Sequence, residues 1–240
     1  MLKYKKTDTI VISDVHLGSM GSQAEKLYHF LDGLLQAPLN RLIIAGDLFE
    51  LWSTNYKDID KYEYKVARKI VELSERGTKV VYIPGNHDRA FRVFERFTMG
   101  KIKIRNEYLI KDNHKKYIVM HGDEFDAFTR NHVVVTLLVD QLYVLLIKWS
   151  ALLKRYFNLG SSMAERKTSA TYMKLVLKVR KAALTYAQSR EVDGIIIGHT
   201  HHPEMFTNEE GIVYANAGDW MDSCSYVVIS DEARLEYYVC

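Results

Sequence analysis

The sequence predicts an α/β fold. Short runs rich in β-branched residues, several of them continuously apolar, alternate with helical segments along the chain, as expected for strands that are covered on both faces. Polar motifs follow five of these runs at the point where each strand should end. The chain has 240 residues, of which 48% are hydrophobic, and this is enough for one sizeable core. We therefore expect a single domain over residues 1–240.

The first half of the chain alternates strand and helix. Ser22-Gln23-Ala24-Glu25 has the pattern of a capping box and predicts a helix that continues to about Gln36. A second helix is expected from Asp60 to Arg76, where Gly77 ends it. The predicted strands of this half are Thr9–Ser13, Arg41–Ala45, Lys79–Ile83 and Lys116–Met120.

After His121 the pattern changes. Two long helices are expected, Phe125–Phe157 and Ser162–Arg190, and no strand interrupts them. The strands then resume as Gly194–Ile197, Ile212–Ala215, Ser225–Ile229 and Arg234–Val239. We interpret residues of about 125–190 as a helical insertion in the α/β scaffold.

Charge and composition restrict the partners. Residues 125–190 hold eleven Lys or Arg against three acidic residues, a net charge of +8, whereas the whole chain carries only +3. This asymmetry indicates an anionic partner for the middle segment. The polar N-terminus lacks the apolar stretch of a signal peptide, and Cys224 and Cys240 imply no disulfide framework. We expect a cytoplasmic protein, soluble or peripheral to a membrane.

The candidate functional residues lie in five motifs, each directly after a predicted strand. Open α/β sheets place ligands at the carboxyl ends of their strands, so these loops should converge. The motifs are Asp14-Val15-His16, Gly46-Asp47, Gly85-Asn86-His87-Asp88, His121-Gly122-Asp123 and Gly198-His199-Thr200-His201.

The residue types and their spacing favour a metal site. Asp14 and His16 are two positions apart, as are His199 and His201, so each pair can project to one face of extended backbone. Carboxylate, imidazole and amide ligands without thiolate suit Mn²⁺, Fe or Zn²⁺. Five loops that supply such ligands suggest two cations roughly 3.5–4 Å apart that share a carboxylate, and Asp47 is the expected bridge. Two dications would attract phosphate and acidify a bound water.

Each motif alone also has an ordinary interpretation. Gly46-Asp47 is more often a simple turn, Asn86-His87-Asp88 is compatible with turn chemistry, and histidine pairs occur on surfaces by chance. The five motifs together, each at a strand end, favour the metal site. His87, next to Asn86, is then a candidate acid or hydrogen-bond donor to the transition state.

These residues resemble the ordered motifs of the calcineurin-like metallophosphoesterase superfamily over roughly Ile10 to Trp220. The resemblance implies a four-layer α/β/β/α sandwich. It also implies two sets of metal ligands that share Asp47. One set is Asp14, His16, Asp47 and His201, and the other is Asp47, Asn86, His121 and His199.

Within the superfamily the chain resembles the UDP-2,3-diacylglucosamine pyrophosphohydrolases of lipid A synthesis. The resemblance implies a lipid-linked UDP-sugar as substrate, cleaved to UMP and 2,3-diacylglucosamine 1-phosphate with two divalent ions, of which Mn²⁺ is the expected metal. His87 departs from the best-known branch, which has Arg there, and Gly218-Asp219-Trp220 resembles a less characterised branch. Many relatives pair their catalytic His with a carboxylate at the position of Glu50; a solvated Glu50 is the alternative. Leu51 stands where protein Ser/Thr phosphatases have a phosphate-binding Arg, which argues against that activity.

The predicted insertion has two interpretations. Its apolar first helix, Val133 to Ile147, is either a lid over acyl chains that contacts the membrane interface or part of a packed hairpin with a solvated basic face. The first interpretation predicts a protein peripheral to the inner membrane. A nuclease is disfavoured because the basic residues lack interleaved stacking aromatics. The alternatives are another phosphodiesterase or nucleotide pyrophosphatase, and a non-catalytic binding scaffold.

Overall fold

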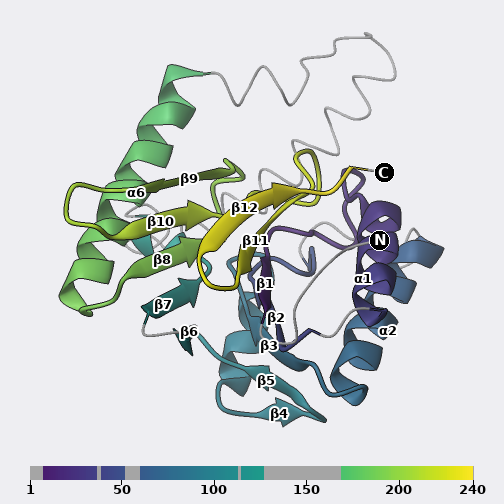
Figure 1. Cartoon of the computed structure of the whole chain (residues 1–240). Helices are drawn as coiled ribbons and strands as arrows, with labels where there is room; N and C mark the ends of the chain where they lie inside the picture. The colour runs from purple at the N-terminus through teal and green to yellow at the C-terminus, as the bar shows by residue number, and fades with distance from the viewer. Residues whose placement is uncertain (1–7, 37–38, 52–59, 113–114, 127–168, 240) are drawn as a thin grey trace, which may run out of the picture.

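The computed structural model describes residues 8–36, 39–51, 60–112, 115–126 and 169–239, which form two β-sheets with helices on their outer faces (Figure 1). Most of the predicted helix Phe125–Phe157, and residues 162–168 of the next one, lie outside the described residues. The lid and hairpin interpretations of that segment therefore stay predictions.

The first sheet has seven strands in the order β12-β11-β1-β2-β3-β5-β4. Strands β1, β2, β3 and β5 run parallel, and β11 and β12 extend the sheet antiparallel beyond β1. The strands are β1 (Thr9–Ile12), β2 (Arg41–Ala45), β3 (Lys79–Ile83), β4 (Thr98–Met99), β5 (Ile102–Ile104), β11 (Ser225–Ile229) and β12 (Ala233–Tyr237).

The second sheet has five strands in the order β6-β7-β8-β10-β9, with β7, β8 and β10 parallel. The strands are β6 (Glu107–Asp112), β7 (Lys115–Met120), β8 (Gly194–Ile197), β9 (Glu204–Thr207) and β10 (Val213–Asn216). Four strands, β4, β5, β6 and β9, were not predicted from the sequence.

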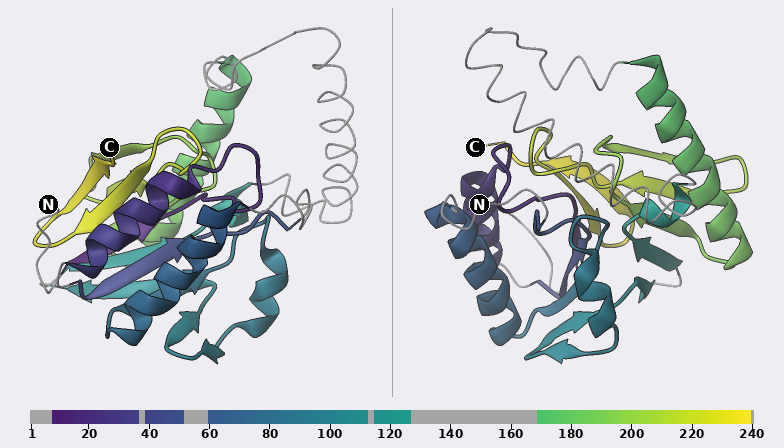
Figure 2. Two further views of the ribbon diagram at one scale, coloured as in Figure 1. Left: turned by 90° about the vertical axis from the view of Figure 1, so that its right-hand side faces the viewer. Right: turned by 180° about the vertical axis from the view of Figure 1, so that it is seen from behind.

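The layers follow from the alternation of side chains along the strands. In β1, Ile10 and Ile12 pack with α1 (Ala24–Leu35) and α2 (Lys61–Glu75), whereas Val11 packs between the two sheets. On the far side of the second sheet, β8 packs against α6 (Ala170–Ser189). Figure 2 shows α1 and α2 side by side on the first sheet. The predicted four-layer α/β/β/α sandwich is confirmed.

Helix α6 is an integral layer of this sandwich from its second turn onward. Val176, Val179, Ala183 and Ala187 are fully buried, and burial of each valine stabilises the fold by up to about 1.5–3 kcal/mol. The helix begins after Ser169, whose side chain accepts a hydrogen bond from Tyr172 N. Among the described residues, no helix is long and apolar enough to cross a membrane.

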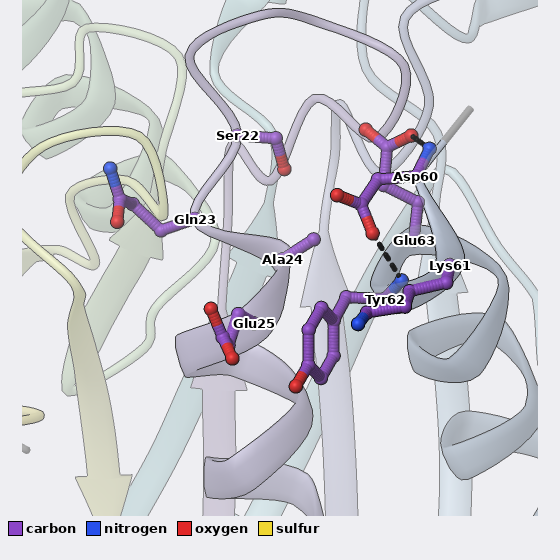
Figure 3. A pocket seen from close by; sticks show the side chains of 8 residues that line it. All are labelled: Ser22, Gln23, Ala24, Glu25, Asp60, Lys61, Tyr62 and Glu63. Carbon is purple, nitrogen blue, oxygen red and sulfur yellow. Dashed lines mark hydrogen bonds between the residues drawn. The ribbon is translucent and has the colours of Figure 1, made fainter. Parts of the chain in front are cut away.

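The start of α1 differs from the prediction, whereas α2 begins within one residue of its predicted start. The capping box predicted at Ser22 is wrong: α1 begins after Gln23 without a side-chain cap, because the Ser22 hydroxyl donates to Val15 O at 3.0 Å. At α2 a capping box is present between Asp60 and Glu63 (Figure 3). A pocket lies between the two helix starts and is lined by residues 22–25 and 60–63, none of them a predicted metal ligand (Figure 3).

Candidate metal centre

The five predicted motifs converge at the carboxyl ends of parallel strands from both sheets. The loop after β1 is bound to the loop after β2, because Val15 N and His16 N both donate to Asp47 O, at 3.0 and 2.8 Å. The two sheets are joined at the same place, where His121 Nδ1 lies 2.8 Å from Ala45 O. Strand topology therefore assembles the site from residues up to 187 positions apart in sequence, Asp14 and His201.

Asp14, His16 and His201 form one group of donors. His201 Nε2 lies 3.2 Å from Asp14 Oδ1, and His16 Nε2 lies 3.9 Å from the same oxygen. The rings of His16 and His201 are stacked, with 5.2 Å between their centroids. The other carboxylate oxygen, Asp14 Oδ2, accepts a hydrogen bond from His199 N at 2.9 Å.

Asp47 stands at the centre of the site. Its Oδ2 lies 3.8 Å from His16 Nε2 and 3.3 Å from His121 Nε2, so it faces both halves of the predicted ligand set. Its Oδ1 accepts a hydrogen bond from His87 N at 2.8 Å. Burial would raise the pKa of Asp47, but the charge and hydrogen bond of His121, with the charges of His16 and His87, hold that pKa well below its usual value.

Asn86 and His199 lie against His121. Asn86 Oδ1 is 3.2 Å from His121 Nε2, and the rings of His121 and His199 meet edge to face with centroids 5.2 Å apart. His199 Nε2 lies 3.9 Å from Asp126 Oδ2. Each of the seven predicted ligands is thus near at least one other, and the tight groups of three donors are formed by Asp14, His16, Asp47, His87, His121 and His201.

Buried donor atoms without partners test whether the site fits a cation. Asp14 Oδ1 and His16 Nε2 are buried and have no hydrogen-bond partner among the described residues, which is costly in a protein interior. Donor atoms held about 2.1 Å from one ion are separated by roughly 3.0–4.2 Å, and the distances within this group are 3.2 and 3.9 Å. A divalent cation would satisfy both orphaned atoms, so the residues fit the metal.

The backbone of the site is strained. Asp14, His16, Asp47, His199 and His201 all have φ between 49° and 64°, a left-handed conformation that non-glycine residues rarely adopt. Such strain costs of the order of 1–3 kcal/mol per residue and is found mainly at functional sites. This backbone strain therefore lowers the stability of the fold and orients five of the predicted ligands.

Glycines before the ligands allow this close approach. A Cβ on Gly198 would lie 2.3 Å from Asp14 Oδ2, and one on Gly46 would lie 2.0 Å from His121 Nδ1. Both distances are far shorter than any real contact, so only glycine fits at these positions.

Glu50 lies between two histidines of the site. Its Oε2 is 2.8 Å from His87 Nδ1 and 3.4 Å from His16 Nδ1, so the predicted Glu50–His87 contact is present. Burial opposes the ionisation of Glu50, but bonds from His16 and His87 lower its pKa to about 2. Burial likewise opposes the charging of His87, whose pKa is nevertheless raised to about 9 by Glu50 and by the charge of Asp47. Both values describe the protein without metal.

Two carboxylates close to His121 in sequence, Asp123 and Asp126, have different partners. Asp123 accepts a hydrogen bond from Arg92 at 2.5 Å and lies 3.5 Å from Arg89, so it pairs with η2 (Arg89–Phe94), the 3-10 helix that follows the Asn86 loop. Asp126 lies instead near His199.

Sequence reasoning missed the contribution of Asp88. Its carboxylate accepts hydrogen bonds from Gly85 N at 2.6 Å and Leu48 N at 2.7 Å, and it contacts the Tyr82 hydroxyl. These bonds fasten the loop after β3 to the loop after β2. Asp88 stands in the motif that identified Asn86 and His87, but its partner on the other loop, Leu48, is distant in sequence and gave no signal.

Comparisons with known proteins find relatives along most of the chain. A family model described as calcineurin-like phosphoesterase matches residues 8–203. The chain is 27% identical over 231 residues to a UDP-2,3-diacylglucosamine hydrolase of Neisseria gonorrhoeae, which covers 92% of each protein. It is also 25% identical to a protein of the same name from Histophilus somni. The 229 aligned residues cover 92% of this chain and 96% of that relative.

A solved structure shares the fold. An archaeal phosphodiesterase aligns with 96% of this chain and 99% of its own, with a TM-score of 0.50 and 12% sequence identity. At this identity the likeness concerns the fold alone.

Proposed function

Because the chain belongs to the calcineurin-like phosphoesterase family and is a hydrolase, we propose that it cleaves the pyrophosphate of a lipid-linked UDP-sugar. The proposed substrate is UDP-2,3-diacylglucosamine, and the products are UMP and 2,3-diacylglucosamine 1-phosphate, as in lipid A biosynthesis. The observation that carries the proposal is a likeness of 25–27% identity along 92% of the chain to relatives that bear this substrate in their names.

The family implies divalent metals, and two sets of residues would hold them. Asp14, His16 and His201 would bind one ion, and Asn86, His121 and His199 the other, with Asp47 common to both. Oxygen and imidazole donors without thiolate favour Mn²⁺, with Fe or Zn²⁺ also compatible. When bound, such ions polarise phosphate oxygens and make water acidic enough to supply hydroxide near neutral pH.

His87 and Glu50 together would hold the proton that is donated to a phosphate oxygen. Glu50 faces Nδ1 of His87 at 2.8 Å, which orients the ring and leaves Nε2 as the atom that donates to a phosphate oxygen. The Glu50 carboxylate also favours the protonated imidazole, so His87 holds the proton that a developing negative charge requires. Bound cations would oppose the protonation of His87 because they repel the charged ring. The negative charge of the Glu50 carboxylate offsets this repulsion.

The membrane is the proposed second partner, through the basic middle segment of the chain, of which α6 is the described part. Helix α6 contains no acidic residue, and Lys174, Lys178 and Lys181 lie exposed along it without an ion pair in the described part of the chain. Each lysine near an anionic surface contributes about 1 kcal/mol. We therefore place the protein at the cytoplasmic face of the inner membrane, as a peripheral protein.

A binding assay tests this placement. Replacing the three α6 lysines with alanine should weaken sedimentation with phosphatidylglycerol vesicles by roughly 100-fold, from about 1 kcal/mol for each lysine. A control variant removes three exposed lysines on the sheets, Lys79, Lys103 and Lys111. Equal losses in both variants would show that only total charge matters, and no loss in the α6 variant would place membrane contact elsewhere.

The substrate is tested by offering the manganese-loaded protein three compounds. They are UDP-2,3-diacylglucosamine, UDP-N-acetylglucosamine and an aryl phosphodiester. We expect UMP from the first at a rate far above turnover of the others. Equal rates on all three would favour a general phosphodiesterase or nucleotide pyrophosphatase, and no turnover of any would favour a binding scaffold.

A further inference from the structure

A buried segment that begins at the last residue of β10 contacts the loops of the candidate metal centre. It consists of residues 216–220, Asn-Ala-Gly-Asp-Trp, and it falls outside residues 8–203 that the family model matches. The side chains of Asn216, Asp219 and Trp220 have no exposed surface. Polar groups buried to this extent require partners, and the Asn216 amide finds its partners on the loop that carries His199 and His201.

Asn216 holds the loop after β8. Its Nδ2 donates to Gly198 O at 2.7 Å and to Thr200 Oγ1 at 2.9 Å. Its Oδ1 accepts a hydrogen bond from Gly218 N at 2.9 Å. The Asn216 amide therefore binds the residues on both sides of His199, and it fixes the backbone from which His199 and His201 project.

The backbone of Trp220 binds the loop that carries Asp14, another member of the group formed by Asp14, His16 and His201. Its backbone N–H donates to Asp14 O at 3.0 Å, and its carbonyl accepts from Gln23 N at 2.8 Å. Asp14 and His201 both have left-handed backbone, with φ of 52° and 53°. The segment thus supports two predicted ligands whose backbone conformation is unfavourable in isolation.

Asp219 faces the imidazole of His201. Its Oδ1 accepts hydrogen bonds from Met221 N, Asp222 N and Ser223 N at 3.0, 2.6 and 3.0 Å, so the carboxylate is fixed in place by its own turn. Its Oδ2 lies 3.5 Å from His201 Nδ1. The other ring nitrogen, Nε2, lies 3.2 Å from Asp14 Oδ1, on the side where the cation would bind.

We propose that Asp219 is a positioning residue that sets the tautomer of His201. A carboxylate beside Nδ1 retains the proton there and leaves the Nε2 lone pair free for a cation. Partners of this kind typically contribute 10- to 100-fold to metal affinity. The inference rests on the proposed metal site, not on the proposed substrate.

Asp219→Asn separates positioning from folding. The amide oxygen of Asn can still accept the three backbone hydrogen bonds of the turn. Its Nδ2 would now donate to His201 Nδ1, which favours a proton on Nε2, the atom required by the cation. The matched control is Asp193→Asn, because Asp193 also accepts a backbone hydrogen bond, from Lys116 N at 2.7 Å, and does so in a turn outside the site.

Calorimetric titration with Mn²⁺ is the first measurement. In D219N we expect one of two binding steps to weaken 10- to 100-fold while the other is unchanged, and in D193N we expect both steps as in the wild type. A folded D219N with two wild-type steps would overturn the proposal. So would a wild-type protein that binds no manganese, which would also remove the proposed site.

A second measurement needs no variant. In wild-type protein loaded with diamagnetic Zn²⁺, ¹⁵N spectra should show His201 with a slowly exchanging proton on Nδ1 and its Nε2 shifted by the metal. Ligation of His201 through Nδ1 would overturn the proposal. Wild-type protein that binds two ions with this tautomer but does not hydrolyse the UDP-sugar would refute the substrate and leave the role of Asp219 intact.

Discussion

Gly85→Ala is the substitution whose effect on the metal centre can be worked out most directly. Gly85 lies in the loop that follows β3, and it is not among the residues with positive φ, so alanine adds no left-handed strain there. The added Cβ would lie 2.2 Å from Asp47 Oδ1 and 2.7 Å from His121 Nε2. Both atoms belong to predicted ligands.

The size of the displacement follows from these distances. Real Cβ contacts are not shorter than 3.0 Å, so Asp47 Oδ1 must retreat from 2.2 Å by at least about 0.8 Å. The same oxygen accepts a hydrogen bond from His87 N at 2.8 Å, and that bond would be stretched. Overpacking of this kind costs about 1–3 kcal/mol in stability, and misplacement by about 1 Å near reacting groups can reduce turnover roughly 100-fold.

The assay compares Gly85→Ala with Gly77→Ala. A Cβ on Gly77 meets nothing within 4 Å, but its φ is +103°, so this control has about 1–2 kcal/mol of backbone strain without a clash in the site. We expect both variants to lose thermal stability in EDTA, and only Gly85→Ala to lose manganese affinity and turnover. A Gly85→Ala protein with wild-type manganese affinity and turnover would refute the central position of Asp47.

Two further predictions concern single side chains. His87→Ala should retain both manganese ions and lose turnover by roughly 10²- to 10⁴-fold, whereas the control His29→Ala, on the exposed face of α1, should be unaffected; normal turnover in His87→Ala would remove the proposed acid. Glu107→Gln should destabilise the metal-free protein modestly at pH 7, by under about 1 kcal/mol because the group is partly exposed. Burial opposes the ionised form of Glu107, but bonds from Arg190 and Tyr186 lower its pKa below the ordinary value of 4.5. Its stabilisation is therefore present above pH 4.5 and is lost as pH falls through the folded-state pKa, so urea unfolding should show the difference from wild type shrinking in acid; a widening difference would contradict the pairing.

The parts of the fold that were predicted are those whose sequence pattern is local. Arg41–Ala45, Lys79–Ile83, Gly194–Ile197 and Ser225–Ile229 occur as strands with the predicted bounds, because each is a continuous apolar run buried on both faces. The end of α2 was also correct, since Gly77 has the left-handed φ that such a helix end requires.

The missed strands are short or lie at edges. Strand β4 has two residues and β5 three, and β9 pairs on one side only, so their stabilisation comes from neighbours that the local sequence does not reveal. The Ser22 capping box failed for a related reason. Its hydroxyl had a nearby tertiary partner, Val15 O, that competed with the helix start.

The convergence of the five motifs was predicted because each follows a strand, and parallel strands end at the same edge of a sheet. The residues that hold the ligand loops in place were not assigned that role from the sequence. Asp88 and Asp219 stand in motifs that were noted from the sequence, but their contacts with Leu48 and His201 form only in the folded chain. Periodicity and spacing do not contain that information.

The shared role of Asp47 is tested most directly by manganese titration with electron paramagnetic resonance at low temperature. Two ions bridged by one carboxylate, about 3.5–4 Å apart, should give an exchange-coupled spectrum in the wild-type protein at two manganese per chain. Asp47→Ala should lose this coupled signal together with at least one binding step. A wild-type protein that binds a single ion, or two ions with uncoupled spectra that Asp47→Ala leaves unchanged, would contradict a metal centre built around this residue.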